Sequence, residues 1–558
     1  MRKYLYICMA VMSLLSCRKI DLESFVPEIP LLTIHEDIIN VSNEGITAEI
    51  EIESNLPWRM TSDASWITVV EGNGLKTGKA KITISKNTIQ EERSAILTVY
   101  IDNNTQRSIQ VIQAAGAPLP NVFKHYYVKA AGSETNDGLS WENASSLHKA
   151  LSSAAEGDII HIAAGTYVPT LPLTGGAIED VAFEINKNVT LIGGYPADAV
   201  EGDISQPEIH KTLLSGNNQA YHVVVVHAER IEGVQVLLSG LTIANGKATG
   251  TGSVNAGGTN VSRNYAGGLY VAKSLVEVEN CSISSNNATN AGAVFIAGNA
   301  QLSIKNSTVS GNSATGNAGS IWNSDGTLYL YNSDVSNNTA TGIAAGLYAI
   351  NTTKQVYNYV YNTTIANNQS GMRCAVFARQ NAIFYLVNST VYGNTSNTGA
   401  SGLVTHASGS EINVINSTIA NNTSTSGEGN ALNILATGGS IRLHNSIAIH
   451  NGSNASIAAS SEIKYQASIF DQVLYDEDGH QTTLVDDTNN LLKSFDSYGA
   501  LGYTAPLSNT NTSAHIHGLT NLQLEVLFNN LSLDMSYYLI DQNNKSRTNR
   551  KAMGAAIE

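Results

Sequence analysis

An asparagine that recurs seven times through the middle of the 558-residue chain constrains the fold more than any other sequence feature. Successive copies lie 26, 26, 30, 26, 28 and 29 residues apart, and a second asparagine follows six residues after the first in every copy, from Asn286 to Asn451. The constant inner interval and variable outer interval indicate rigid strands joined by loops of variable length, as in a solenoid. The first asparagines are Asn280, Asn306, Asn332, Asn362, Asn388, Asn416 and Asn445.

The residues before each first asparagine alternate in polarity. Apolar side chains stand two and four residues before it, as in Leu302 and Ile304, and the residues between them are mostly polar or tyrosine. This period of two marks a strand with one inward face. A second strand, such as Ser320-Ile321-Trp322, ends each coil. With a third short strand per coil, we expect a triangular parallel β-helix over residues 121–558, which the residues beyond about Ala455 finish or cap.

Equivalent side chains of such a solenoid stack about 4.8 Å apart from coil to coil. The asparagine columns are therefore expected to form amide ladders, and we assign this structural role to the seven first asparagines. The same role accounts for the Asn-Ser-Thr runs, which match the N-glycosylation pattern.

Aromatic residues also recur in columns. Their spacing of about 4.8 Å is close to the length of one sugar residue, so a comb of outward rings could stack along an extended glycan. Stacked rings can equally stabilise neighbouring coils, or be covered by loops. The glycan-binding candidates are Tyr329, Tyr359 and Tyr385 three residues before the first asparagine, Tyr331 and Tyr361 one residue before it, and Trp322 and Tyr348 in the column Tyr270, Phe295, Trp322, Tyr348 and Phe377.

Residues 1–17 are typical of an export signal. Arg2 and Lys3 precede an apolar run too short to span a bilayer, and the segment ends in Leu14-Leu15-Ser16-Cys17. This ending resembles a lipobox, which implies lipidation of Cys17 and an outer-membrane location in a Gram-negative bacterium. An ordinary secretory signal with a chance cysteine is the alternative. The lipid is the only membrane contact that we expect, and residues 18–31 form a linker.

Residues 32–116 have shorter alternating strands. Ile50 and Ile52 face one way while Glu49 and Glu51 face the other, and further runs indicate an antiparallel sandwich of about 85 residues. The segments 55–58, 64–69, 86–95 and 111–116 resemble the BACON domain of Bacteroidetes surface proteins. The resemblance implies carbohydrate binding or a spacer role, on a protein that faces the cell exterior. Trp58 and Trp66 are either sugar platforms or core residues.

Two further segments carry a resemblance. Residues 127–167, including Gly157-Asp158-Ile159-Ile160, resemble the opening of pectin-lyase-like β-helices, and residues 541–558 resemble the closing segment of polymorphic-membrane-protein-like β-helices. Together with the sandwich expected over residues 32–116, these resemblances imply an all-β chain in which an immunoglobulin-like sandwich precedes a right-handed parallel β-helix.

The charged residues give little indication of catalysis. A net charge of −15 argues against nucleic acid as a partner. Hydrolases on this scaffold need carboxylates about 5–9 Å apart, and lyases need acidic Ca²⁺ ligands with a basic residue. The acidic residues between Val276 and Ala455 share no column, and the cysteines lack metal-site spacing. We predict no catalytic residue, no metal and no cofactor, although an acidic stretch at 471–487 leaves Ca²⁺ or a solvated loop as alternatives.

Three functions are therefore open. We rank first the binding of a polysaccharide or of a host or cell-surface glycan. A structural stalk comes second. A polysaccharide lyase or glycoside hydrolase comes third, because only resemblance of fold favours it.

Overall fold

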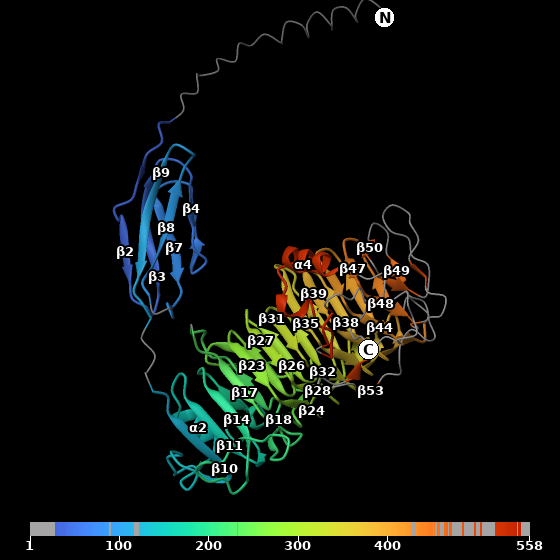
Figure 1. The fold of residues 1–558 in the computed structure, drawn as a ribbon. Coiled ribbons are helices and arrows are strands. Elements are labelled where there is room, and N and C mark those ends of the chain that lie inside the picture. Colours follow the sequence, from blue (N-terminus) through green and yellow to red (C-terminus); the bar gives the residue numbers. More distant parts are fainter. Residues whose placement is uncertain are drawn as a thin grey trace, which may run out of the picture. The chain divides into compact units, whose positions relative to one another are not determined.

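A computed structural model describes residues 28–88, 91–116, 122–231, 233–426, 431–449, 451, 455–457, 462–466, 468–470, 483–484, 496–497, 503–504, 519–543 and 545–547. The chain divides at residue 118 into two compact units (Figure 1). Cys17 and most of the acidic stretch at 471–487 lie outside the described residues. None of the helices in the described part is long and apolar enough to cross a membrane.

The first unit is the predicted sandwich of two sheets. Apolar residues that alternate along the strands form its core, among them Ile50 and Ile82 from one sheet and Leu97 and Ile109 from the other. Neighbouring strands are antiparallel except β2 and β9. The sheets are β1 (Leu32–Thr33), β3 (Ile46–Ser54), β7 (Gly78–Ile84) and β5 (Ile67–Glu71), and β2 (Ile38–Val41), β9 (Gln106–Gln113), β8 (Arg93–Tyr100), β4 (Trp58–Ser62) and β6 (Asn73–Gly74).

The second unit is a parallel β-helix, as the repeat predicts (Figure 1). Sheet 1 contains the strand before each first asparagine. Its strands are β10 (His125–Ser133), β11 (Ile159–Ala163), β14 (Thr190–Tyr195), β17 (Val236–Ser239), β23 (Leu275–Glu279), β27 (Gln301–Lys305), β31 (Thr327–Tyr331), β35 (Val356–Tyr361), β39 (Ala382–Val387), β43 (Glu411–Ile415), β47 (Ser440–His444) and β50 (Glu462–Gln466).

Sheet 2 follows the first asparagine and sheet 3 ends the coil. Sheet 2 comprises β12 (Gly165–Tyr167), β15 (Thr212–Ser215), β18 (Leu241–Ala244), β24 (Ser282–Ser284), β28 (Thr308–Ser310), β32 (Asp334–Ser336), β36 (Thr364–Ala366), β40 (Thr390–Tyr392), β44 (Thr418–Ala420), β48 (Ile447–Ile449), β51 (Ile469–Phe470) and β52 (Thr483–Leu484). Sheet 3 comprises β13 (Phe183–Ile185), β16 (Val224–Val226), β22 (Leu269–Ala272), β26 (Val294–Ala297), β30 (Ile321–Asn323), β34 (Leu347–Ile350), β38 (Val376–Arg379), β42 (Leu403–His406), β46 (Leu432–Ile434) and β49 (Ala455–Ile457).

A fourth, shorter sheet departs from the triangular cross-section that the sequence predicts. It follows the second asparagine, where small residues such as Ala314 and Ala340 face inward. Sheet 4 comprises β19 (Lys247–Ala248), β25 (Asn287–Ala288), β29 (Ser313–Ala314), β33 (Thr339–Ile343), β37 (Gln369–Met372), β41 (Thr395–Thr398) and β45 (Thr423–Ser424). The remaining elements are α2 (Leu147–Ser153), η1 (Ile178–Asp180), the hairpin β20 (Ser253–Ala256) and β21 (Thr259–Ser262), β53 (Asp496–Ser497), β54 (Tyr503–Thr504), α4 (Asn521–Asn530) and η3 (Met535–Tyr537).

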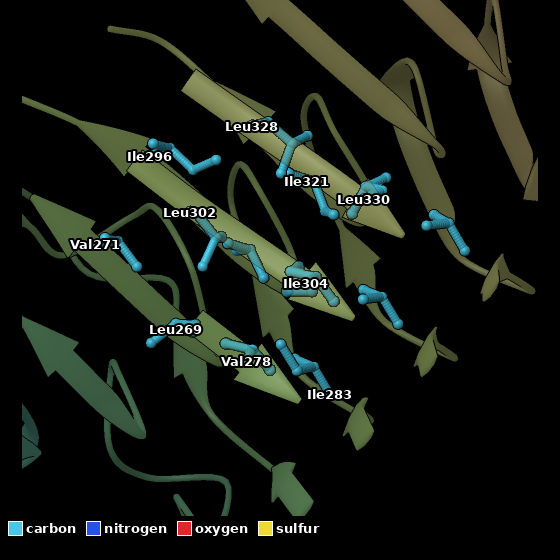
Figure 2. Packing of buried hydrophobic residues seen from close by; sticks show 14 of the residues in the cluster. Leu269, Val271, Val278, Ile283, Ile296, Leu302, Ile304, Ile321, Leu328 and Leu330 are labelled. Carbon is cyan, nitrogen blue, oxygen red and sulfur yellow. The ribbon is translucent and has the colours of Figure 1, made fainter. Parts of the chain in front are cut away.

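The solenoid core consists of apolar side chains stacked in columns (Figure 2). Leu302 and Ile304 of β27 pair in register with Leu328 and Leu330 of β31, and all four are buried. Like residues thus lie above one another, as the repeat predicts.

The continuous amide ladder passes through the second asparagine of each copy. Each side-chain Nδ2 donates to the Oδ1 of the next coil at 2.8–3.0 Å, from Asn286 to Asn451. The same Oδ1 also accepts the backbone N–H of the preceding asparagine at 2.9–3.1 Å. Nδ2 further donates to a carbonyl of the preceding coil. These side chains therefore satisfy backbone groups that the corner of the coil leaves unpaired.

The first asparagines, to which we assigned the ladder, have a different role. Each has φ between 47° and 53°, a left-handed conformation that asparagine tolerates better than most residues. Among the described residues, side-chain bonds within this column join Asn332 to Asn306 and Asn445 to Asn416, so the column holds isolated pairs. The assignment of the ladder to Asn280, Asn306, Asn332, Asn362, Asn388, Asn416 and Asn445 is corrected accordingly, because the turn between sheets 1 and 2 selects these residues.

A hydroxyl ladder accounts for the serine or threonine that follows six of the seven first asparagines; Cys281 follows Asn280. The backbone N–H of this serine or threonine donates to the hydroxyl of its equivalent in the next coil at 3.0–3.4 Å, from Ser307 to Ser468. Asn388 and Asn416, which begin two of the Asn-Ser-Thr runs, are fully buried, whereas Asn306, which begins a third, is exposed. The runs are thus explained by corner geometry and coil-to-coil bonds.

The closing segment lies along the side of the solenoid. We call its described residues, 519–543 and 545–547, the clasp. Leu519 N–H donates to Asn445 Oδ1, while Gln542 bonds the hydroxyls of Thr364 and Thr390. These contacts lie within the stack, so the described part of the segment expected to cap the solenoid spans the flank of several coils.

Candidate functional site

The outward tyrosines of sheet 1 form a stack of parallel rings. Tyr329 and Tyr359 have centroids 5.0 Å apart, Tyr359 and Tyr385 are 5.2 Å apart, and both pairs are parallel within 10°. A second row pairs Tyr331 with Tyr361 at 5.2 Å. Because each ring face inside the rows meets the next ring, the rows present mainly ring edges outward.

The stack ends at β27, where smaller or charged residues replace the rings. Ser303 is the register partner of Tyr329, and Lys305 is the partner of Tyr331. Strand β27 therefore contributes no tyrosine to cover these two rings. The space forms a groove of about 430 Å³ across β17, β23, β27 and β31, lined by Gln235, Leu275, Val276, Glu277, Gln301, Ser303, Lys305, Asn306, Tyr329, Tyr331, Asn332, Asp534 and Tyr537.

Polar groups face the two rings across the groove. Lys305 Nζ lies 2.8 Å from Glu277 Oε2, which also accepts from Gln235 Nε2 at 3.2 Å. Glu279 is the register partner of Lys305, but the ammonium reaches diagonally to Glu277 and so leans away from Tyr331. Ser303 Oγ is a buried atom of the lining without a hydrogen-bond partner among the described residues.

The clasp supplies the far wall of the groove. Tyr537 stacks on Tyr361 at 4.8 Å and lies 6.1 Å from Tyr331, while Asp534 N–H donates to the Tyr361 hydroxyl. Phe528 is fully buried in a cluster with Tyr361, which is itself buried. Tyr361 is therefore unavailable as a sugar platform, and Tyr359 and Tyr385 are half-buried against the same cluster.

Burial raises the pKa of the tyrosines in these rows. The pKa of Tyr359 rises to about 12, chiefly through desolvation and also through the neighbouring phenols. Desolvation also raises the pKa of Tyr329 and Tyr331. The phenols are consequently neutral hydrogen-bonding groups at neutral pH.

An alkaline titration monitored at 295 nm should resolve this effect. Tyr359 is expected to ionise near pH 12, well above an exposed tyrosine at about 10. Since its pKa is raised on folding, the stability it contributes is complete below pH ~10 and is lost as the pH rises through ~12. Tyr359→Phe should reduce the amplitude of the late ionisation by one tyrosine, because the pKa values of Tyr270 and Tyr537 also rise to about 12. An unchanged late amplitude in that variant would contradict the assignment.

The aromatic column on sheet 3 is covered. Tyr270 and Phe295 pack under Val254 and Val261 of the β20–β21 hairpin, so the long insertion shields the outer face of this sheet. Tyr348, one of the glycan-binding candidates, is 2% exposed. Trp322 is half-buried and meets Tyr348 edge-on at 4.5 Å. The placement favours coil stabilisation over glycan contact for both candidates.

The two tryptophans of the first unit are also built into its structure. Trp58 is 1% exposed, and its Nε1 donates to the Lys76 carbonyl at 2.9 Å. Trp66 is half-buried with the Arg93 guanidinium 4.4 Å from its ring centre. Trp58 is thus a core residue, and one face of Trp66 is occupied by Arg93.

The described residues contain no group of three or more histidine, cysteine or acidic side chains placed to hold a metal ion. In the groove, Glu277 is ion-paired and Asp534 Oδ1 accepts from Ser536 at the start of η3. The arrangement offers aromatic faces, a salt bridge and amides, which suit the stacking and hydrogen bonding of a polar ligand.

Residues 56–114 match the BACON family, described as "Putative binding domain, N-terminal". The first unit is therefore a BACON domain, and a parallel β-solenoid follows it. A comparison with curated proteins gives no match.

Solved structures similar to the chain include three carbohydrate-active enzymes. A Bacteroides ovatus GH5 xyloglucanase in complex with a XXXG heptasaccharide is 16% identical with a TM-score of 0.15, over 29% of this chain and 45% of that one. The pectate lyase Pel9A is 13% identical with a TM-score of 0.40, over 70% and 91%. A rhamnogalacturonan lyase is 11% identical with a TM-score of 0.40, over 70% and 96%.

Proposed function

We propose that this protein is a lipid-anchored cell-surface protein that binds glycans through the groove at the end of the tyrosine stack. The single observation that carries the proposal is that Tyr329 and Tyr331 present ring faces to a groove whose opposite side holds Glu277 and Lys305. Aromatic faces match the C–H faces of sugars, while paired charges and amides match their hydroxyls. The BACON domain, as a binding module, supports a carbohydrate-related role.

The anchor rests on the lipobox-like Leu14-Leu15-Ser16-Cys17. Acylation of Cys17 would fix the protein to the outer membrane, and the BACON domain favours an orientation toward the cell exterior. The ligand would then be a polysaccharide or a host or cell-surface glycan.

A glycan array probed with residues 18–558, followed by affinity gels containing the best ligand, tests this function. Tyr329→Ala should weaken retention about tenfold, because it removes an aromatic contact of about 1.4 kcal/mol. The matched control is Tyr385→Ala, which removes a ring from the far end of the same row and should leave retention unchanged. If no glycan is retained by the wild-type chain, the proposal is wrong and a stalk role is favoured. Release of reducing ends or unsaturated uronates during the incubation would point to an enzyme instead.

A further inference from the structure

We propose that the groove takes a glycan laid across the coils, with consecutive sugar rings on Tyr329 and Tyr331, and that it selects β-linked chains with flat, parallel rings. This inference rests on the proposed function, since it names the ligand class and the orientation at the same groove.

The two rings of β31 lie next to each other in parallel planes. Tyr329 and Tyr331 leave the same face of β31 two residues apart, with centroids 6.1 Å apart and planes within 4° of each other. Each also stacks parallel on a ring of the next coil at 5.0–5.2 Å. The ring normals therefore point along the stack while the two centres are displaced along the strand. The rings lie side by side and form one flat surface.

The ring faces that are already covered restrict the direction in which a glycan can lie. Between Tyr329, Tyr359 and Tyr385 the ring faces already contact each other, and the clasp buries Tyr361. A glycan running along the rows would meet mainly the edges of the rings. This differs from the stacking along the tyrosine column that the sequence spacing suggested. A chain running parallel to β31 meets two open faces in succession. The geometry thus favours a glycan that crosses the solenoid.

The groove in front of this surface offers room and polar contacts for a ligand. Ser303 and Lys305 stand where further rings would continue the rows, and Lys305 is drawn away toward Glu277. The gap left by the serine can hold one layer of sugar. Ser303 Oγ and Asn332 Oδ1, both in the lining, have no hydrogen-bond partner among the described residues. Both atoms are buried, so the polar groups open to a ligand are the Glu277–Lys305 pair and the Gln235 amide.

The linkage follows from the flatness of the surface. Two parallel faces side by side require consecutive sugars whose mean planes are parallel. Equatorial 1,4-links, as in β-glucans, β-mannans and β-xylans, keep successive rings in a ribbon, whereas the axial links of α-1,4-glucans or α-1,4-galacturonans turn each ring against the last. A β-1,4-linked chain therefore covers both tyrosines, and an axially linked chain covers one.

Calorimetric titration of residues 18–558 with tetrasaccharides tests the linkage. The probes are the β-1,4 tetramers of glucose, mannose and xylose and the α-1,4 tetramers of glucose and galacturonate. We expect the tightest β-linked tetramer to bind at least about tenfold more strongly than either α-linked one, a difference of ~1.4 kcal/mol. Equal affinities, or a preference for an α-linked tetramer, would overturn the inference while leaving glycan binding intact.

Ser303→Tyr tests the direction. The new ring would stack on Tyr329 and so add a fourth tyrosine to the row of Tyr329, Tyr359 and Tyr385. The same ring would fill the groove. Crossing glycans should lose at least about tenfold in affinity, whereas a glycan lying along the row should gain affinity, and a gain or no change contradicts the inference. Ser303→Ala is the matched control and should retain affinity within about threefold. Near-ultraviolet circular dichroism checks the fold of both variants, and absence of binding by the wild-type chain to all glycans rejects the proposed function itself.

Discussion

Asn368→Ala is expected to lower the free energy of unfolding of the solenoid by about 4 kcal/mol, because each buried polar group left unpaired costs about 1–3 kcal/mol. The Oδ1 of Asn368 accepts from the backbone and the side chain of Asn338, both at 3.0 Å. Its Nδ2 donates to the Val335 carbonyl and to Asn394 Oδ1, both at 2.9 Å. Alanine therefore removes the acceptor of the buried Asn338 N–H and a donor to the Val335 carbonyl. Asn338 Nδ2 keeps only its bond to the Val309 carbonyl, and Asn394 Oδ1 keeps only the Asn368 N–H.

Urea unfolding followed by far-ultraviolet circular dichroism measures this loss. The control is Asn280→Gly in the first column, where the side chain is exposed and φ is 52°. Glycine adopts that conformation freely, so the change should stay within about 0.5 kcal/mol. A loss below about 1 kcal/mol in Asn368→Ala would show that the ladder contributes little beyond the apolar core.

Phe528→Ala is expected to release the clasp from the solenoid. Phe528 lies on α4, fully buried against Tyr361, Val387 and Ile415. Truncating a buried phenylalanine costs about 3–5 kcal/mol. Since the clasp can detach while the coils stay folded, the cost should appear as local opening.

Hydrogen exchange of residues 519–543 detects that opening. The amides of α4 should exchange roughly 10²–10³-fold faster in Phe528→Ala than in the wild type. Leu522→Ala on the same helix provides the control, because Leu522 is 69% exposed and its loss should leave exchange unchanged. Equal acceleration in both variants would indicate that helix propensity, and not packing on the tyrosines, holds the clasp in place.

Much of the scaffold could be predicted from the sequence because its determinants are local and periodic. Alternation along β27 and β31 identifies inward Leu302 and Leu328, and the repeat places them in register. The sandwich strands were recognisable for the same reason. The assignment of the amide ladder to the first asparagines was wrong because both asparagine columns recur with the same period. Only the backbone torsion of residues such as Asn306 distinguishes the asparagines of the turn from those of the ladder.

The candidate site was harder to predict. The sequence identified Tyr329 and Tyr331, and the serine at 303 marks where the row ends, but spacing alone does not reveal which way the rings face. The clasp contacts join residues 149 and 178 positions apart, Asn388 with Tyr537 and Thr364 with Gln542. No short-range periodicity encodes such contacts, and covering of the sheet 3 column by the β20–β21 hairpin depends equally on long-range packing.

The first and second asparagines of each copy are always six residues apart, and this constant spacing makes the copies structurally equivalent. From Asn286 to Asn451, each copy makes the same ladder bonds to its neighbours, whatever the length of its loop. Deletion or duplication of one whole coil would therefore bring together two coils that can form the same bonds. Such a solenoid can gain or lose coils, or change its outward side chains, during evolution while the hydrogen bonds between coils stay the same.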